Sequence, residues 1–161
     1  MRVQGLDDDI QGIIFDMDGL LVNSEKLYWD ANIQAAEEEN LGTPRDAYLK
    51  LTGATVKEMQ DFYHKYFKTE ADRDRFIKRT DDLVWQWTDE GKLKLQPGVQ
   101  EALDEFEKRG LKMAIASSNY ENVVQHAMWA TGIRNYFDFH LSYLDVQRGH
   151  IKAKPAPDIY L

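Results

Sequence analysis

Two acidic residues with a single residue between them follow a short apolar run near the start of the sequence. The chain reads GIIFDMDG from Gly12, so Asp16 and Asp18 come directly after a segment typical of a buried strand. Carboxylates with this spacing suit a hard cation such as Mg²⁺, which binds one or two protein carboxylates together with water and phosphate oxygens. An aspartate here could also attack phosphorus while a second one transfers protons, and Gly19 would let the backbone approach a ligand closely. The pair indicates cation or phosphoryl chemistry, but an isolated pair of this kind is common and decides neither.

A second polar cluster follows another apolar run later in the chain. Ser117, Ser118 and Asn119 come directly after the segment LKMAIA at 111–116, and Ser117 and Asn119 could donate hydrogen bonds to phosphate oxygens. Lys154 could neutralise the charge that phosphoryl transfer spreads over those oxygens. The alternatives are structural, because serine and asparagine are also ordinary turn residues and a lysine before a proline can lie on the surface.

The elements that must position these clusters can be predicted from periodicity and from turn residues. An apolar residue every three or four positions predicts helices, short β-branched runs predict strands, and glycines mark several ends. The first predicted element is a strand at 12–15. Three helices follow it: one at 25–39, one that begins near Thr55, and one that carries Phe76 to Trp87 and stops near Gly91. The remaining elements are a helix from Val99 to Gly110, a strand at 111–116, a helix around 124–131 and a weaker strand at 139–142.

The order of these elements predicts an α/β fold with a helical insertion. Strands that alternate with helices form right-handed βαβ units and a parallel sheet, which we assign to residues 1–22 and 95–161. The block at 23–94 contains helices alone and is predicted to be an inserted subdomain. In open parallel sheets ligands bind beyond the carboxyl ends of the strands, which is where the DMDG and SSN segments fall.

Composition narrows the classes of function. The chain has 161 residues and a formal net charge of −8, which argues against binding to a nucleic-acid backbone as the main activity. It has no cysteine, so disulfides and thiolate zinc sites are excluded. No apolar run approaches the roughly 18 residues of a membrane span. We expect a soluble cytoplasmic protein that binds neither nucleic acid nor a membrane.

The histidines and tryptophans do not indicate a site of their own. The histidines are scattered without the spacing of metal ligands, and the tryptophans favour core or hinge packing over a platform that stacks a ligand. These residues are His64, His126, His140 and His150, and Trp29, Trp85, Trp87 and Trp129.

Taken together and in order, three segments resemble one known family. FDMDGLLVNSE, LQPGVQEALDEFEKRGLKMAIASSN and KPAPDIYL are similar to motifs of the haloacid dehalogenase superfamily, in the branch of β-phosphoglucomutase-like phosphatases and mutases with a helical cap. The resemblance covers nearly the whole chain from Gly12. It implies a Rossmann-like parallel sheet as the core, the block at 23–94 as the cap, Mg²⁺ as the cofactor and a small phosphorylated metabolite, such as a sugar phosphate, as the substrate.

The resemblance also implies a role for each polar cluster. Asp16 would be the nucleophile and Asp18 the general acid and base. The side chain of Asp16 and the backbone carbonyl of Asp18 would hold Mg²⁺. Ser117, with Asn119 beside it, would bind the transferring phosphoryl group, and Lys154 would stabilise the aspartyl-phosphate.

In the cap, the loop around Thr52, Gly53 and Thr55 would face the substrate. Two departures from the family pattern affect what the resemblance implies. Asn23 stands where an aspartate is usual, which is expected to alter the hinge more than the chemistry. Val56 stands where the sugar phosphomutases place an arginine for the distal phosphate, so a phosphatase is favoured over a mutase.

The largest departure is at the end of the sequence. Members of the family continue into a further strand and an acidic motif that completes the metal site, whereas this sequence ends at Leu161. We therefore expect an N-terminal portion of such an enzyme, with a truncated core of about three strands and an unpaired sheet edge. The leading hypothesis is a Mg²⁺-dependent phosphatase that acts through an aspartyl-phosphate. The alternatives are a sugar phosphomutase and a catalytically inactive fragment or interaction module, and the oligomeric state stays open.

Overall fold

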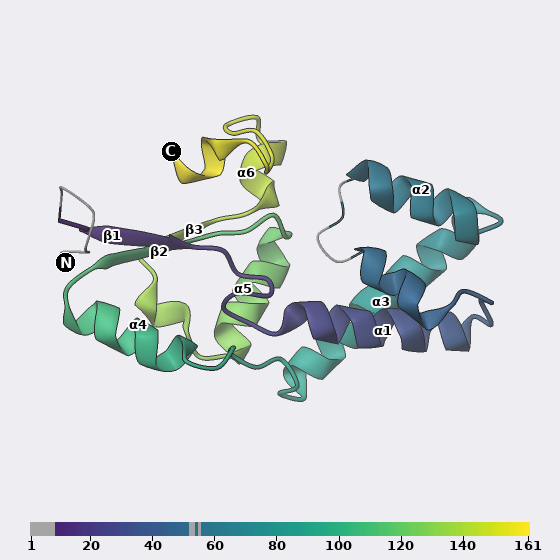
Figure 1. Cartoon of the computed structure of the whole chain (residues 1–161), viewed down its shortest axis with the longest axis horizontal. Helices are drawn as coiled ribbons and strands as arrows, with labels where there is room; N and C mark the ends of the chain where they lie inside the picture. The colour runs from purple at the N-terminus through teal and green to yellow at the C-terminus, as the bar shows by residue number, and fades with distance from the viewer. Residues whose placement is uncertain (1–8, 52–53, 55) are drawn as a thin grey trace. The chain divides into compact units, whose positions relative to one another are not determined.

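The computed structural model describes residues 9–51, 54 and 56–161. The chain forms two compact units, which Figure 1 shows in one view. The α/β unit contains the described residues up to Asn23 together with Leu93–Leu161, and the helical unit contains the described residues of Ser24–Lys92. The chain therefore leaves the α/β unit after Asn23 and returns to it at Leu93.

A parallel three-stranded sheet forms the centre of the α/β unit. The strands lie in the order β1-β2-β3, and Phe15, Ile115 and His140 are aligned in register across them. This arrangement confirms the predicted α/β class and the parallel sheet. The elements of the unit are β1 (Gly12–Phe15), α4 (Val99–Lys108), β2 (Lys112–Ala116), α5 (Glu121–Ala130), η2 (Arg134–Tyr136), β3 (Phe139–Leu141), α6 (Tyr143–Gln147) and η3 (Pro157–Tyr160).

The two faces of the sheet differ in how they are covered. In Figure 1, α4 and α5 lie on one side of the strands and α6 lies on the other. Right-handed crossovers between strands that follow one another in order place their helices on the same face. On that face, the ring of Phe15 lies 6.1 Å from Phe106 and 5.9 Å from Phe137.

On the opposite face of the sheet, two of three aligned side chains are more exposed to solvent than the sequence predicts. Ile14, Ala114 and Phe139 are aligned in register, and Ile14 and Phe139 are 43% and 55% exposed. The prediction of a buried strand at Gly12–Phe15 is therefore wrong for part of β1. The reason is that β1 is an edge strand, with β2 as its one strand partner among the described residues.

Among its described residues, four helical segments build the other unit around an aromatic core. Its elements are α1 (Ser24–Glu38), η1 (Arg45–Leu51), α2 (Val56–Tyr66) and α3 (Glu70–Asp89). Phe76 of α3 is 1% exposed, and its ring lies 5.0 Å from Phe67 and 5.8 Å from Tyr48. Between α1 and α3, the buried hydroxyl of Thr80 donates to Oδ1 of Asn32 at 3.2 Å. The helices predicted from the apolar periodicity are confirmed.

Helix α3 ends just before Gly91, the glycine predicted to stop it. Gly91 has a φ of 73°, a left-handed conformation that glycine adopts without steric cost. Its N–H donates to the carbonyl of Thr88 at 2.9 Å, and the N–H of Lys92 donates to the carbonyl of Trp87 at 2.8 Å. These bonds satisfy carbonyls that the end of the helix leaves open.

Two of the four tryptophans do not pack as predicted. Trp129 is 74% exposed and Trp85 is 42% exposed, so the prediction of core packing is wrong for both. Trp129 lies on the outer stripe of α5 with Gln125, one turn away, while the inner stripe carries the buried Val124 and Met128. Among the described helices, none combines the length and the apolar character that crossing a membrane requires.

Candidate active site

A tight turn follows β1 and carries both candidate aspartates. We call residues 16–22 the aspartate turn. The carbonyl of the buried Met17 accepts hydrogen bonds from the N–H groups of Leu21 and Val22 at 2.9 and 3.2 Å. Gly19 has a φ of 75°, and its N–H donates to the carbonyl of Val22 at 3.0 Å. These bonds fold the backbone back on itself, so Asp16 and Asp18 are held at the carboxyl end of β1.

Lys154 lies against Asp16 although 138 residues separate them. Its ammonium nitrogen Nζ donates to Oδ1 of Asp16 at 2.7 Å and to the carbonyl oxygen of Ala116 at 2.8 Å. The Lys154 side chain is only 22% exposed, so the alternative of an ordinary surface lysine does not describe it. The second bond fixes the ammonium at the end of β2, next to β1, which Asp16 directly follows.

The surroundings of Lys154 favour its charged form. Burial lowers the pKa of the Lys154 ammonium, whereas hydrogen bonds to Asp16 and Tyr160 and the charge of Asp16 raise it. The net result is a pKa above the ordinary value for lysine. At neutral pH the site therefore presents a positive charge beside the first aspartate.

The serine and asparagine of the second cluster contact the other aspartate. Ser117 Oγ donates to Oδ2 of Asp18 at 3.3 Å, and Asn119 Nδ2 approaches the same oxygen at 3.5 Å. The N–H of Asn119 donates to Ser117 Oγ at 3.0 Å, and the Ser117 side chain is fully buried. Ser118, predicted with them, is exposed. The segment is therefore more than a turn, because two of its side chains reach the aspartate turn.

The two aspartates consequently have different surroundings within one short turn. Asp16 faces the ammonium of Lys154, which is a charged donor. Asp18 faces a hydroxyl and an amide, which are neutral donors. A pair of carboxylates whose surroundings differ in this way can divide two tasks between them, attack by one and proton transfer by the other.

Comparison with known proteins decides the family. The family model for the haloacid dehalogenase-like hydrolases matches residues 13–161. The chain belongs to this family. The match confirms the family that the three motifs predict.

Relatives of this haloacid dehalogenase-like hydrolase include named phosphatases. The phosphorylated carbohydrates phosphatase of Thermotoga maritima is 28% identical over 152 residues, which cover 94% of this chain and 68% of that protein. The pyrophosphatase PpaX of Oceanobacillus iheyensis is 27% identical over 154 residues, which cover 92% of this chain and 65% of the relative. The chain thus spans about two thirds of the length of these relatives. Both names agree with the predicted class of enzyme.

Solved structures share the fold. CbbY from Rhodobacter sphaeroides, determined in complex with phosphate, aligns with a TM-score of 0.72 at 24% identity, over 94% of this chain and 70% of that one. At this level of identity the similarity concerns the fold alone. It agrees with the α/β core that the sheet order establishes.

The aspartate turn of this haloacid dehalogenase-like hydrolase offers donors that suit part of a Mg²⁺ site. Within residues 9–51, 54 and 56–161, no group of three or more histidine and acidic side chains is arranged to hold a metal ion. Mg²⁺ needs fewer, because it takes one or two carboxylates and fills its other positions with water and phosphate oxygens. Lys154 binds Oδ1 of Asp16, which leaves Oδ2 as a possible ligand. The donor set fits a cation whose remaining ligands come from elsewhere.

Gln96 supports the aspartate turn, although the sequence analysis predicts no role in the site for it. Its Nε2 donates to the carbonyl of Gly19 at 3.1 Å, and its backbone N–H donates to the carbonyl of Leu21 at 2.9 Å. Nearby, Asn23 exchanges two bonds with Lys94. The N–H of Asn23 donates to the Lys94 carbonyl at 3.0 Å, and Asn23 Oδ1 accepts from the Lys94 N–H at 2.8 Å. The two chain segments that lead to and from the helical unit are therefore clamped together beside the candidate site.

The predicted substrate loop lies outside the part of the chain that the structure describes. This applies to Thr52, Gly53 and Thr55, while Val56 is the first residue of α2. The predicted contacts of this loop with a substrate therefore stay predictions.

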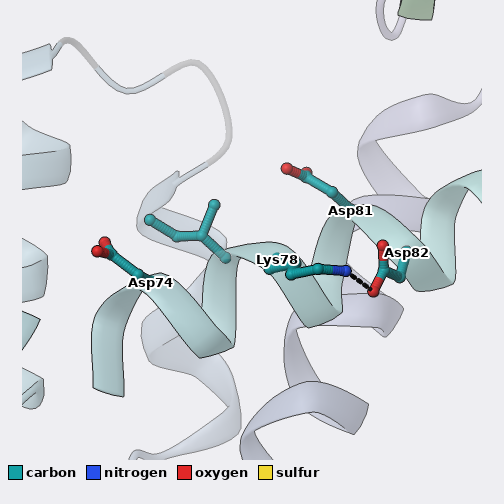
Figure 2. A pocket seen from close by; sticks show the side chains of 5 residues that line it. Asp74, Lys78, Asp81 and Asp82 are labelled. Carbon is teal, nitrogen blue, oxygen red and sulfur yellow. Dashed lines mark hydrogen bonds and ion pairs between the residues drawn. The ribbon is translucent and has the colours of Figure 1, made fainter. Parts of the chain in front are cut away.

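A hollow on the helical unit does not suit a phosphorylated ligand. Figure 2 shows it along α3, where Lys78 reaches Oδ2 of Asp82 at 2.6 Å. Asp74 and Asp81 also line it, so three carboxylates oppose one ammonium. Such a surface repels phosphate, and the sequence predicted none of these residues as part of a site.

Proposed function

We propose that this protein is a Mg²⁺-dependent phosphatase that hydrolyses a small phosphorylated metabolite through an aspartyl-phosphate. The observation that carries the proposal is the junction at the carboxyl ends of β1 and β2. There Lys154 contacts Asp16 at 2.7 Å, while Ser117 and Asn119 contact Asp18. A nucleophile, a proton donor, a cation and two phosphate-binding side chains are the groups that phosphoryl transfer to an aspartate needs.

In the first step, a carboxylate oxygen of Asp16 attacks phosphorus. The new bond joins Asp16 to the phosphoryl group, and the bond between phosphorus and the leaving oxygen breaks. Asp18, protonated at this stage, gives its proton to that oxygen, so the dephosphorylated metabolite leaves as a neutral alcohol. Lys154 offsets the negative charge on the phosphoryl oxygens, and Ser117 and Asn119 orient them.

In the second step, water attacks the phosphorus of the aspartyl-phosphate. Asp18, now ionised, accepts the proton of the water, and the bond between Asp16 and phosphorus breaks. Inorganic phosphate is released, and both aspartates return to their starting states. The contact of Lys154 with Asp16 stabilises the departing carboxylate, which regains its negative charge in this step.

Mg²⁺ would be held by the side chain of Asp16 and the backbone carbonyl of Asp18. When bound, it would neutralise part of the charge of the phosphoryl group and orient it. The helical unit would act as the cap that excludes water from the first step.

The proposed substrate is a sugar phosphate. The name of the Thermotoga maritima relative, a phosphorylated carbohydrates phosphatase, supports this choice. Val56 supports a phosphatase over a mutase, because valine provides no positive charge for a second phosphate.

The proposal is tested by replacing Asp16 with asparagine in the chain as it stands. Phosphate release is measured from sugar phosphates and from pyrophosphate at millimolar Mg²⁺, with the intact mass of the chain checked first. We expect Asp16→Asn to lower the rate by about a thousandfold or more, because the amide cannot serve as the nucleophile. Asp61→Asn, which changes an exposed aspartate of the helical unit, is the matched control and should leave the rate unchanged.

Two outcomes would contradict the proposal. Undiminished turnover by Asp16→Asn would remove Asp16 as the nucleophile. A wild-type chain of verified mass that hydrolyses none of these substrates would instead favour the inactive interaction module.

A further inference from the structure

The ammonium of Lys154 has a third neighbour, Tyr160, which lies in the KPAPDIYL segment but has no predicted role. Besides Asp16 and the carbonyl of Ala116, the ring of Tyr160 lies beside it, with Nζ 5.1 Å from the ring centroid. This distance is within the roughly 6 Å at which an ammonium is attracted by the face of an aromatic ring. An ammonium has three N–H donors, and here the two oxygens and Tyr160, through its ring and a hydrogen bond to its hydroxyl, surround it.

A compact turn places Tyr160 next to Lys154. Tyr160 is the last residue of η3 (Pro157–Tyr160), and the preceding Ile159 is 3% exposed and so anchors the turn in the core. Oδ2 of Asp158 accepts a hydrogen bond from the N–H of Lys152 at 3.2 Å. This bond closes the segment between Lys152 and Asp158, which contains Lys154. Lys154 lies within this closed segment and Tyr160 follows it by two residues, so the lysine and the ring come from neighbouring parts of the chain.

The contact restricts a side chain that otherwise has much freedom. A lysine ammonium sits on a flexible stem of four carbons and can form hydrogen bonds in many rotamers. The Tyr160 ring lies on one side of the ammonium, so rotamers that would place Nζ in the space of the ring are disfavoured. What remains is the orientation in which Nζ meets Oδ1 of Asp16 at 2.7 Å.

We propose that Tyr160 is a positioning residue, whose ring holds the Lys154 ammonium against Asp16 and the transferring phosphoryl group. The proposal rests on the proposed phosphatase function and adds to it a residue that acts only through Lys154. Its effect should appear in the rate of the chemical step rather than in substrate binding, because the ring orients the lysine and the cap and the phosphoryl contacts hold the substrate. An aromatic side chain should serve where an aliphatic one does not.

The kinetic test compares two substitutions at this position. We expect Tyr160→Leu to lower kcat about tenfold, since small errors in the placement of a catalytic group have large costs, and to leave KM within about twofold. Tyr160→Phe keeps the ring and loses only the hydroxyl with its hydrogen bond to Lys154, so its kcat should fall less than that of Tyr160→Leu and stay within about threefold of the wild type. Trp129→Leu, which removes an aromatic side chain that is 74% exposed on α5, is the control and should leave both constants unchanged.

A spectroscopic test reads the contact without any turnover. Lysines are labelled with ¹³C at Cε, and the Lys154 signal is assigned by its loss in Lys154→Arg. The proton signal of the Lys154 ε-methylene group should be shifted upfield by the ring. That shift should persist in Tyr160→Phe and disappear in Tyr160→Leu.

These readouts separate the two proposals. A wild-type chain that shows the shift but hydrolyses nothing would contradict the phosphatase function and leave the contact intact. An unchanged kcat in Tyr160→Leu, or a Lys154 signal that is the same in both variants, would overturn the positioning role. If Tyr160→Leu does not fold, Tyr160→Met replaces it as the aliphatic variant, with the same expected results.

Discussion

Oppositely charged side chains pair in both units of the chain, but their surroundings differ. In the helical unit, Arg79 of α3 binds Glu38 of α1 at 2.5 Å, with the two side chains 37% and 40% exposed. In the α/β unit, Lys154 binds Asp16 at 2.7 Å and is 22% exposed. The helical pair joins two helices across the surface of the unit. The pair in the α/β unit joins two distant segments at the end of a strand.

The difference shows how one kind of interaction serves two purposes. A pair as exposed as Arg79 and Glu38 contributes little free energy, because water and salt screen the attraction. The main effect of the pair between Arg79 and Glu38 is to favour the packing of α3 against α1 in one orientation. Lys154 and Asp16 have further partners in the carbonyl of Ala116 and the ring of Tyr160. Those partners fix the direction of the ammonium, which is what the proposed chemistry requires.

The two units also differ in their cores. The helical unit is built around stacked aromatic rings that include Phe76, which is 1% exposed. The α/β unit is built around its middle strand β2, where Ile115 is 0% exposed. Each core lies within its own unit, so damage to one should leave the other largely intact.

The largest expected effects are on the free energy of unfolding, and they test whether the two units are stable independently of each other. Phe76→Ala should destabilise the helical unit by about 3–5 kcal/mol, and Ile115→Ala should destabilise the α/β unit by about 2–5 kcal/mol, because each leaves a cavity in a packed core. Amide hydrogen exchange gives the measurement for each unit. Phe76→Ala should lower the protection of α1 and α3, and Ile115→Ala should lower that of β1 and β2.

The exposed Leu49, at 54%, provides the control. Leu49→Ala should change stability by no more than about 0.5 kcal/mol. If either core substitution lowered protection equally in both units, the units would unfold as one, and the comparison between them would fail.

A smaller effect is expected from the clamp beside the aspartate turn. Gln96→Leu removes the hydrogen bond from Nε2 to the carbonyl of Gly19 and should cost about 1 kcal/mol. It should lower phosphatase activity severalfold, because Gly19 adjoins Asp18. Urea unfolding and steady-state kinetics measure the two effects.

The matched variant for Gln96→Leu is Gln86→Leu. Gln86 lies exposed on α3 and donates to Oε1 of Glu90 at 2.7 Å. We expect it to change neither activity nor stability measurably. Equal effects of the two substitutions would mean that the bond to Gly19 has no special role.

The smallest expected effect is on the stability that the pair between Arg79 and Glu38 gives the helical unit at low pH. Hydrogen bonds from Arg79 and then Gln34 lower the pKa of Glu38 from 4.5 to about 2. Because the folded-state pKa is depressed, the stabilisation is present above about pH 4.5 and is lost as the pH falls toward 2. The urea midpoint of Arg79→Met should therefore lie slightly below that of the wild type at pH 6, and the two should converge near pH 2. A difference between them that did not depend on pH would show that Arg79 acts through packing alone.

Much of the fold could be predicted from the sequence because it depends on local patterns. The apolar spacing in α3, the strand at Lys112–Ala116 and the stop at Gly91 all follow from neighbouring residues. The same reasoning failed for Ile14 and Trp129, since the exposure of a side chain depends on what the rest of the chain places over it. The contact of Gln96 with Gly19 could not be predicted either, because the partner is a backbone carbonyl 77 residues away.

By itself, the sequence determined the order of the elements, the family and the identity of the side chains with reactive groups. Only the tertiary structure decided which of them meet. Ser117 is 99 residues from Asp18, and Lys154 is 138 residues from Asp16. The physical reason is that these contacts depend on the parallel alignment of β1 and β2 and, for Lys154, on the return of the chain after α6 to the end of β2. That alignment brings the carboxyl ends of both strands to one edge of the sheet, and no local pattern encodes which side chains lie there in contact.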